Sequence, residues 1–307
     1  MFNLFWPYSN RDVINDYVQS LRKIFNINNE ILSISPNLDL ISHNIFLENF
    51  EDVYIIDELN HFCKNNKKKV SIIATEFLEK NLENEEHFFT VNNERINETS
   101  YKNNNKYMTR RLYNLLKIKK NILSIINIFY LPKLNVYYEY LREPDIKLFE
   151  LPVPNYQFNI TRLNCDYDLY FSGKLTSYRL AIIDELSQKG FKILYEKTFV
   201  DEDTRVSNIK KANFCLNIPQ DKKWKWSSTM RYMHALKNGR MVAEYKSNLL
   251  TNYFSSYCIN FSNKIDLYKQ YERSLNNINN KTNKFVPKNF EKDLDKFLTF
   301  VKSHPCS

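Results

Sequence analysis

The sequence predicts an α/β protein with two doubly wound parallel sheets and a C-terminal helix, and three observations support that class. The chain has 307 residues, which is more than one compact domain usually holds. Short apolar runs suited to buried parallel strands alternate with helical patterns in both halves. Glycine occurs at only 3 positions, each at a junction between expected elements of the second half: Gly173, Gly190 and Gly239.

The first half, residues 1–154, is expected to form one α/β domain. Strands are expected at 2–6, 31–34, 53–56, 70–74, 122–129 and 146–151. Helices are expected at 12–24 and 107–118, with a polar loop over 92–106 and a loop or helix surface over the acidic stretch 79–86. Pro152 and Pro154 then form a stiff break suited to a linker.

The second half, residues 155–285, alternates more regularly. Strands are expected at 168–172, 191–195, 213–218, 240–245 and 256–261, and helices at 176–189, 206–212, 229–237 and 246–253. Because successive strand–helix–strand units build a parallel sheet, this half predicts a second doubly wound domain. Residues 286–307 are expected to hold a last helix, 289–301, and packing of this helix back on the N-terminal domain is one expectation.

The composition limits the partners and the compartment. The net charge of +9 fits nucleic acid, an anionic membrane surface or phosphorylated small molecules, although a biased genome could also explain it. No run approaches the ~18 apolar residues of a membrane span, and residues 1–8 lack the basic leader of a signal peptide. The 5 cysteines and 5 histidines show no metal-type spacing, so we expect a cytoplasmic protein with reduced thiols, no metal and no cofactor.

The first candidate site follows the expected strand at 168–172. Ser172 and Gly173 would turn the chain into the next helix, whose free N–H groups can bind an anion. Lys174 and Arg179 could add charge-assisted contacts to a diphosphate. The alternative is an ordinary capped helix N-terminus. The spacing fits neither a dinucleotide fingerprint nor a P-loop, which disfavours a dehydrogenase and a P-loop NTPase.

The second candidate site lies within 209–244. Arg231 and His234 are three residues apart on an expected helix, so both can face one ligand. Trp226, in the loop before that helix, can stack on a nucleobase, and Glu244 would end the next strand facing a cleft. The alternatives are a partly buried helix histidine and a tryptophan that fixes its own loop.

These two segments resemble the donor-domain core of GT-B glycosyltransferases, in the group that includes the spore-maturation-like enzymes. The resemblance covers about 168–261 and is carried by an arginine that opens a helix, an Ala-Leu-x-x-Gly helix end, a glutamate that closes the next strand, and the first loop. The matching residues are Ser172, Gly173, Arg179, Arg231, Ala235, Leu236, Gly239 and Glu244. It implies two Rossmann-like domains facing a central cleft, with a sugar-nucleotide donor bound by the C-terminal half.

The passage departs from that group in one respect. Many retaining members have a pair of glutamates at the positions where Trp226 and His234 stand here. A glutamate that would hold the nucleotide ribose is therefore missing, which leaves the donor and the stereochemistry open.

An inverting transfer needs a base near the acceptor hydroxyl, and GT-B enzymes usually take acceptor contacts from N-domain loops. We predict Glu76 first and Asp57 second, because they follow the expected strands at 70–74 and 53–56. The alternative for each is a solvated loop carboxylate. Asp166-Tyr-Asp168 and Asp201-Glu-Asp203 spell the DxD motif of metal-dependent enzymes, but neither follows a strand directly, so no metal is expected.

The sequence thus predicts a metal-independent glycosyltransferase that moves a sugar from a nucleotide-activated donor to a saccharide, lipid-linked or other hydroxyl acceptor. The basic amphipathic helix at 107–118 could contact a membrane surface peripherally, or could simply cover a sheet with a solvated basic face. One alternative is a non-enzymatic nucleic-acid-binding protein, although Lys and Arg form no concentrated stripe and no nucleic acid is expected. Another is a sugar-nucleotide epimerase or a fucosyltransferase-like enzyme.

Overall fold

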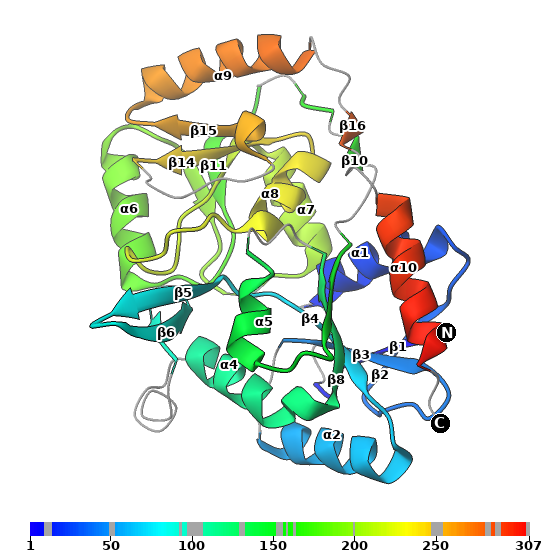
Figure 1. Cartoon of the computed structure of the whole chain (residues 1–307). Helices are drawn as coiled ribbons and strands as arrows, with labels where there is room; N and C mark the ends of the chain where they lie inside the picture. Colours follow the sequence, from blue (N-terminus) through cyan, green and yellow to red (C-terminus); the bar gives the residue numbers. More distant parts are fainter. Residues whose placement is uncertain are drawn as a thin grey trace. The chain divides into compact units, whose positions relative to one another are not determined.

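The computed structural model describes residues 1–8, 14–48, 53–91, 94–96, 107–128, 133–151, 156–157, 159–161, 164–198, 200–246, 254–279, 284–285 and 290–304. The chain divides into two compact units (Figure 1). Unit 1 comprises Met1–Pro154 and Pro287–Ser307, and unit 2 comprises Asn155–Val286. In the described part of the chain, no helix combines the length and the apolar character that crossing a bilayer requires.

Unit 1 is built on a parallel sheet of six strands in the order β2-β1-β3-β4-β8-β9. The inner strands are buried along their whole length, as parallel strands covered on both faces should be: β1 (Phe2–Phe5), β3 (His43–Leu47), β4 (Val70–Ile73) and β8 (Ile122–Asn127). The edge strands, β2 (Leu32–Ser35) and β9 (Lys147–Glu150), are partly exposed.

Helices connect these strands and supply the rest of the unit 1 core. They are α1 (Asn15–Asn26), α2 (Val53–Asn66), α4 (Tyr107–Ile118), the short η2 (Lys119–Asn121) and α5 (Val136–Leu141). Their buried positions recur at helical spacing, for example Leu112 and Leu115 of α4, both fully buried against the core.

The acidic stretch that we expected to be a loop or helix surface is a β-hairpin. Strands β5 (Leu78–Glu83) and β6 (Glu86–Val91) pair antiparallel, and β7 (Glu94–Arg95) adds to β6. Asn84 and Glu85 form the tight turn with φ of 49° and 67°, the left-handed pair that matches the twist of a hairpin. The expected loop at 92–106 lies outside the described residues apart from 94–96.

Unit 2 is built on a parallel sheet of five strands in the order β12-β11-β13-β14-β15. The strands are β11 (Tyr167–Phe171), β12 (Ile193–Tyr195), β13 (Ala212–Leu216), β14 (Met241–Tyr245) and β15 (Cys258–Phe261). The helices are α6 (Ser177–Gln188), α7 (Glu202–Lys210), α8 (Thr229–Lys237), the short η3 (Ser255–Tyr257) and α9 (Lys264–Asn279). A small antiparallel pair, β10 (Tyr156–Gln157) with β16 (Lys284–Phe285), completes the unit.

The last helix, α10 (Phe290–Ser303), belongs to unit 1. Its buried Phe297 lies in an aromatic cluster, 6.0 Å from Phe2, 6.3 Å from Phe25 and 5.2 Å from Phe149, measured between ring centroids. An ion pair of 2.8 Å between Lys302 and Glu30 adds to this contact. Unit 1 is therefore made of two chain segments that flank unit 2 in the sequence.

The predicted α/β class with two doubly wound parallel sheets is confirmed by these strand orders. Several elements differ from the expected ones: 53–56 is the start of helix α2 and no strand, and the strand β3 was not expected. Helices α5 and α9 were not expected either. The expected helix at 246–253 lies outside the described residues beyond Lys246, and the arrangement of the domains around a central cleft stays a prediction.

Candidate functional site

The order of the unit 2 strands marks one place for a ligand. The chain runs from β11 outward to β12 and then returns past β11 to β13, so the direction of winding changes between β11 and β13. In open α/β sheets, ligands bind outside the carboxyl ends of the strands at this switch point. The segments that follow these two strands are Ser172–Lys174 and Asn217–Pro219.

Arg231 of α8 connects both of these segments. Its Nε donates to the carbonyl of Ser172 at 3.2 Å, and its Nη1 donates to Asn217 Oδ1 at 2.9 Å and to the carbonyl of Ile218 at 3.0 Å. Within the described residues, its Nη2 has no hydrogen-bond acceptor. Burial lowers the pKa of this guanidinium to about 10, and the charge of Glu244 opposes that effect, so the group is cationic at neutral pH.

Gly173 leaves room for this guanidinium. Its φ is +134°, a conformation that residues with a Cβ rarely adopt, and a Cβ built there would lie 3.1 Å from Arg231 Nη2. The switch point therefore presents a fixed cation beside a glycine, and the two N–H groups of Nη2 have no acceptor among the described residues.

Glu244 has a different position from the expected one. Its side chain is buried within β14 and does not face solvent, because Oε1 accepts hydrogen bonds from Asn217 Nδ2 (2.6 Å), Ser227 Oγ (2.6 Å) and the Tyr232 hydroxyl (3.0 Å). Asn217 in turn accepts from Arg231. Glu244 thus positions Arg231 through Asn217.

Arg179 also turns inward. It is 1% exposed, and its guanidinium donates to the carbonyls of Ile218, Pro219 and Lys174 over distances of 2.6–3.2 Å. These contacts correct the expected contact to a diphosphate, because the donor groups already hold two loops together. Lys174 itself is exposed and free to reach a ligand at the same edge.

The remaining predicted donor residues lie near this edge. His234 of α8 and Ser172 line a small pocket of about 20 Å³ together with Arg231 and Asn217, and the convergence of Arg231 and His234 on one ligand stays a prediction. Trp226 is half-buried in the loop before α8.

A larger cavity of about 370 Å³ lies at the carboxyl ends of β11 and β12. Its lining residues come from the loop after β11, the loop after β12 and the start of α7. They are Ser172, Gly173, Lys174, Leu175, Glu196, Lys197, Thr198, Val200 and Arg205. The first three of these are predicted site residues, whereas those after β12 were not predicted from the sequence.

The two DxD spellings have structural roles. Asp168 accepts from the Tyr268 hydroxyl, the Lys192 N–H and Lys264 Nζ, at 2.7–2.8 Å. Asp201 caps α7 by accepting from the N–H of Thr204 at 2.8 Å.

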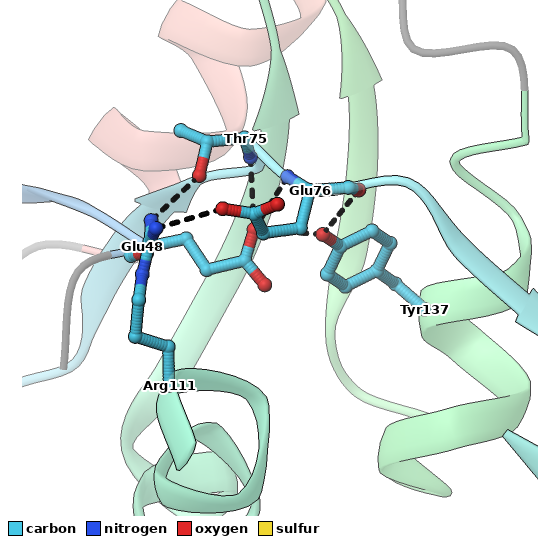
Figure 2. Close-up of polar contacts among 5 residues, drawn as sticks. All are labelled: Glu48, Thr75, Glu76, Arg111 and Tyr137. Carbon is cyan, nitrogen blue, oxygen red and sulfur yellow. Dashed lines mark hydrogen bonds and ion pairs between the residues drawn. The ribbon is translucent and has the colours of Figure 1, made fainter. Parts of the chain in front are cut away.

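In unit 1, a second polar cluster lies at the carboxyl ends of β3 and β4 (Figure 2). Glu48 follows β3 directly and is fully buried. Its Oε2 accepts from the N–H groups of Thr75 (2.8 Å) and Glu76 (3.2 Å) and from the Tyr137 hydroxyl (2.7 Å), whereas its Oε1 has no hydrogen-bond partner in the part of the chain that the structure describes. Burial raises the pKa of Glu48 to about 7; Arg111 lowers it and Glu76 raises it further.

Arg111 holds the rest of this cluster together. It donates to Glu76 Oε1 at 2.7 Å, to Thr75 Oγ1 at 2.8 Å and to the carbonyl of Glu48. Only 11% of the Glu76 side chain is exposed. Arg111 is one of the cations of the predicted basic helix, and the structure turns it into the protein, away from any surface role.

The two predicted catalytic carboxylates therefore differ. Glu76 follows β4, as expected, and belongs to the cluster around Arg111. Asp57 lies on the exposed face of α2 and not at the end of a strand, which corrects its expected position. Glu48 was missed because its strand was missed; the apolar run 45–47 directly before it, like the run before Glu76, was the available signal.

The fold and the two clusters define a protein of two doubly wound parallel α/β units with polar side chains gathered at the strand ends, the class expected from the resemblance to GT-B glycosyltransferases. No family model and no curated protein matches the sequence. Among solved structures, that of T4 phage β-glucosyltransferase is similar, with a TM-score of 0.49 and 11% identity over 98% of each chain. TarM follows with a TM-score of 0.38 and 10% identity over 87% of this chain and 55% of that one. The GtfA/B complex has a TM-score of 0.35 and 9% identity over 97% of this chain and 58% of that chain.

Proposed function

We propose that this chain is a glycosyltransferase that moves a sugar from a nucleotide-activated donor to a hydroxyl acceptor, in the cytoplasm. The observation that carries the proposal is the guanidinium of Arg231, which is fixed at the switch point of unit 2 with Nη2 uncommitted beside Gly173. The resemblance of 168–261 to the donor domain of GT-B enzymes gives this cation its ligand, the diphosphate of a sugar nucleotide.

The chemistry of the leaving group fits these residues. Departure of a nucleoside diphosphate places negative charge on the phosphate oxygens, and preorganised donors at that position lower the barrier. Arg231 and Lys174 would supply positive charge, and the N-terminus of α6, after its cap Thr176, would add its dipole. We therefore expect transfer to proceed without a metal ion.

Glu76 remains the proposed proton acceptor for the acceptor hydroxyl. Its side chain is partly accessible, whereas Glu48 is fully buried. The ion pair with Arg111 fixes its orientation, as a positioned base requires. The acceptor would be a saccharide, a lipid-linked sugar or another hydroxyl compound; docking of α4 on a membrane has less support because Arg111 faces inward.

Binding of nucleotides tests the proposal directly. We expect UDP, GDP or CMP to raise the thermal unfolding temperature and to bind measurably by calorimetry. Arg231→Gln should weaken binding by about 10- to 100-fold, the value of one charge-assisted hydrogen bond to phosphate. Lys174→Gln, a change at an exposed position, should weaken it several-fold without affecting the fold.

Arg273→Gln is the matched control, because Arg273 is an exposed arginine of the same unit on α9. A chain that ignores all three nucleotides and is stabilised by oligonucleotides alone would overturn the proposal in favour of nucleic-acid binding. Release of free nucleoside diphosphate from a sugar nucleotide, dependent on an added acceptor, then separates a transferase from an epimerase.

A further inference from the structure

The larger cavity of unit 2 extends sideways from the switch point, from the loop after β11 to the loop after β12. Three cationic side chains line it, Lys174, Lys197 and Arg205, and so does one carboxylate, Glu196. A pocket built for phosphate alone gains nothing from a carboxylate in its wall, because the two charges repel. The mixed lining instead fits a ligand that carries an anionic group and hydroxyl groups side by side.

Strand pairing fixes where Glu196 lies. Phe171 at the end of β11 pairs with Tyr195 at the end of β12, so Ser172 and Glu196 are level with each other, one strand apart. Adjacent strands are about 5 Å apart. A ribose attached to a diphosphate at Ser172 and Gly173 can reach Glu196 if it extends along the cavity toward β12, because both ends of this path line the same cavity.

Glu196 is held in a defined orientation. Its Oε1 accepts a hydrogen bond of 2.5 Å from Asn208 Nδ2 of α7, and the carboxyl group is half-buried in the cavity wall. A carboxylate has two oxygens with several acceptor sites, so it can accept both hydroxyls of a vicinal diol while keeping the Asn208 contact. An acidic side chain at the end of the second strand holds the ribose in other dinucleotide-binding α/β folds.

We infer that Glu196 binds the ribose diol of the donor nucleotide, inside the cavity that it shares with Lys174, Lys197 and Arg205. The inference rests on the proposed function and identifies its substrate class as a ribonucleoside diphosphate sugar.

The test compares ligands with and without the diol. UDP, GDP and ADP, each beside its 2′,3′-dideoxy analogue, and inorganic pyrophosphate are titrated calorimetrically into the wild-type chain and into Glu196→Ala. In the wild type, the ribo form should bind about 10- to 100-fold more tightly than the dideoxy form. In Glu196→Ala, both forms should bind like the wild-type dideoxy complex, and pyrophosphate should bind unchanged, which shows that the variant is folded.

Asp203→Ala is the matched control, since Asp203 is an exposed carboxylate on the adjacent α7 and should leave the ribo preference intact. A Glu196→Ala variant that keeps the full ribo preference overturns the inference and leaves the proposed function standing. A wild-type chain that binds none of the nucleotides and no pyrophosphate overturns the proposed function, and the inference with it.

Discussion

Replacing Glu48 by Gln should change how the stability of unit 1 depends on pH. Glu48 is fully buried and its pKa is raised from 4.5 to about 7, chiefly by that burial. The amide oxygen of Gln can take the place of Oε2 and keep the three donors from Thr75, Glu76 and Tyr137. The amide nitrogen would then stand where Oε1 has no partner. Gln therefore mimics the protonated acid at every pH.

The sign follows from proton binding. A carboxyl group with a raised pKa in the folded state binds a proton there that the unfolded chain has already released, so the free energy of unfolding falls as pH rises. The two pKa values, 4.5 and about 7, correspond to about 3 kcal/mol in total, at about 1.4 kcal/mol per unit. Of this, about 2.5 kcal/mol falls between about pH 5 and about pH 8.

The assay is urea unfolding of the wild-type and Glu48→Gln chains at these two pH values. Trp6 is the one tryptophan of unit 1, so a background with Trp224→Phe and Trp226→Phe makes fluorescence report on that unit. Glu150, whose pKa burial also raises to about 7, is the same in both chains and cancels in their difference.

We expect the free energy of unfolding of Glu48→Gln, taken relative to that of the wild type, to be about 2.5 kcal/mol larger at the higher pH than at the lower pH. Glu58→Gln, on the exposed face of α2, removes a carboxylate from the same unit without touching the cluster and serves as the control. A difference between wild type and Glu48→Gln that is the same at both pH values would refute the reasoning.

Three further substitutions test other parts of the structure. Arg179→Met should lower the free energy of unfolding of unit 2 by about 3 kcal/mol, because buried carbonyls lose their donors. Urea unfolding checks this, and an unchanged free energy would contradict the role of Arg179 in holding the two loops together. Phe297→Ala should cost unit 1 about 3–5 kcal/mol in the same assay, whereas Thr299→Ala on the exposed side of α10 should be close to neutral. Gly173→Ala should weaken nucleotide binding in calorimetry, whereas Gly190→Ala, with φ of +82° but nothing within 4 Å, should lower stability and leave binding unchanged; equal binding losses would contradict the role given to Gly173.

The fold was predictable where a strand is mostly apolar, as at β4, β8 and β13, because short runs of this kind are typical of strands that are buried on both faces of a parallel sheet. The run 53–56 was misassigned because four apolar residues fit a strand and the first turn of a helix equally well. Only Leu59 and Cys63, buried further along at helical spacing, identify α2.

Strand β3 was not predicted from the sequence because it begins with two polar residues. His43 and Asn44 are buried all the same, because each has a hydrogen-bond partner inside the sheet region: Ser71 at 2.7 Å for His43, and Asn3 at 2.9 Å for Asn44. These partners lie on the neighbouring strands of the sheet, which are far from β3 in the sequence, so a local sequence pattern does not reveal them.

The candidate site of unit 2 was predictable in location and less so in the direction of its side chains. Gly173 and Arg231 could be found because a glycine after a strand and an arginine opening a helix are both marked in the sequence. Arg179 was expected to face the ligand, yet it points inward, because the carbonyls of the loop after β13 are its partners. Glu196 could not be predicted as a site residue from the sequence, because its position near Ser172 depends on the pairing of β12 with β11.

The discontinuity of unit 1 has a consequence for synthesis on the ribosome. The aromatic surface of Phe2, Phe25 and Phe149 is completed by Phe297, which is translated after all of unit 2. At about 5–20 residues per second, synthesis of the chain between Phe149 and Phe297 takes roughly 7–30 s, and this surface stays uncovered for that time. Unit 2, one continuous segment, can become protease-resistant on nascent chains while unit 1 is still open to cleavage. Proteolysis of released chains truncated after residue 286 should show unit 2 protected and unit 1 open to cleavage, and equal protection of both units would exclude this order. Helix α10 therefore completes the unit 1 core only after the whole of unit 2 has been synthesised.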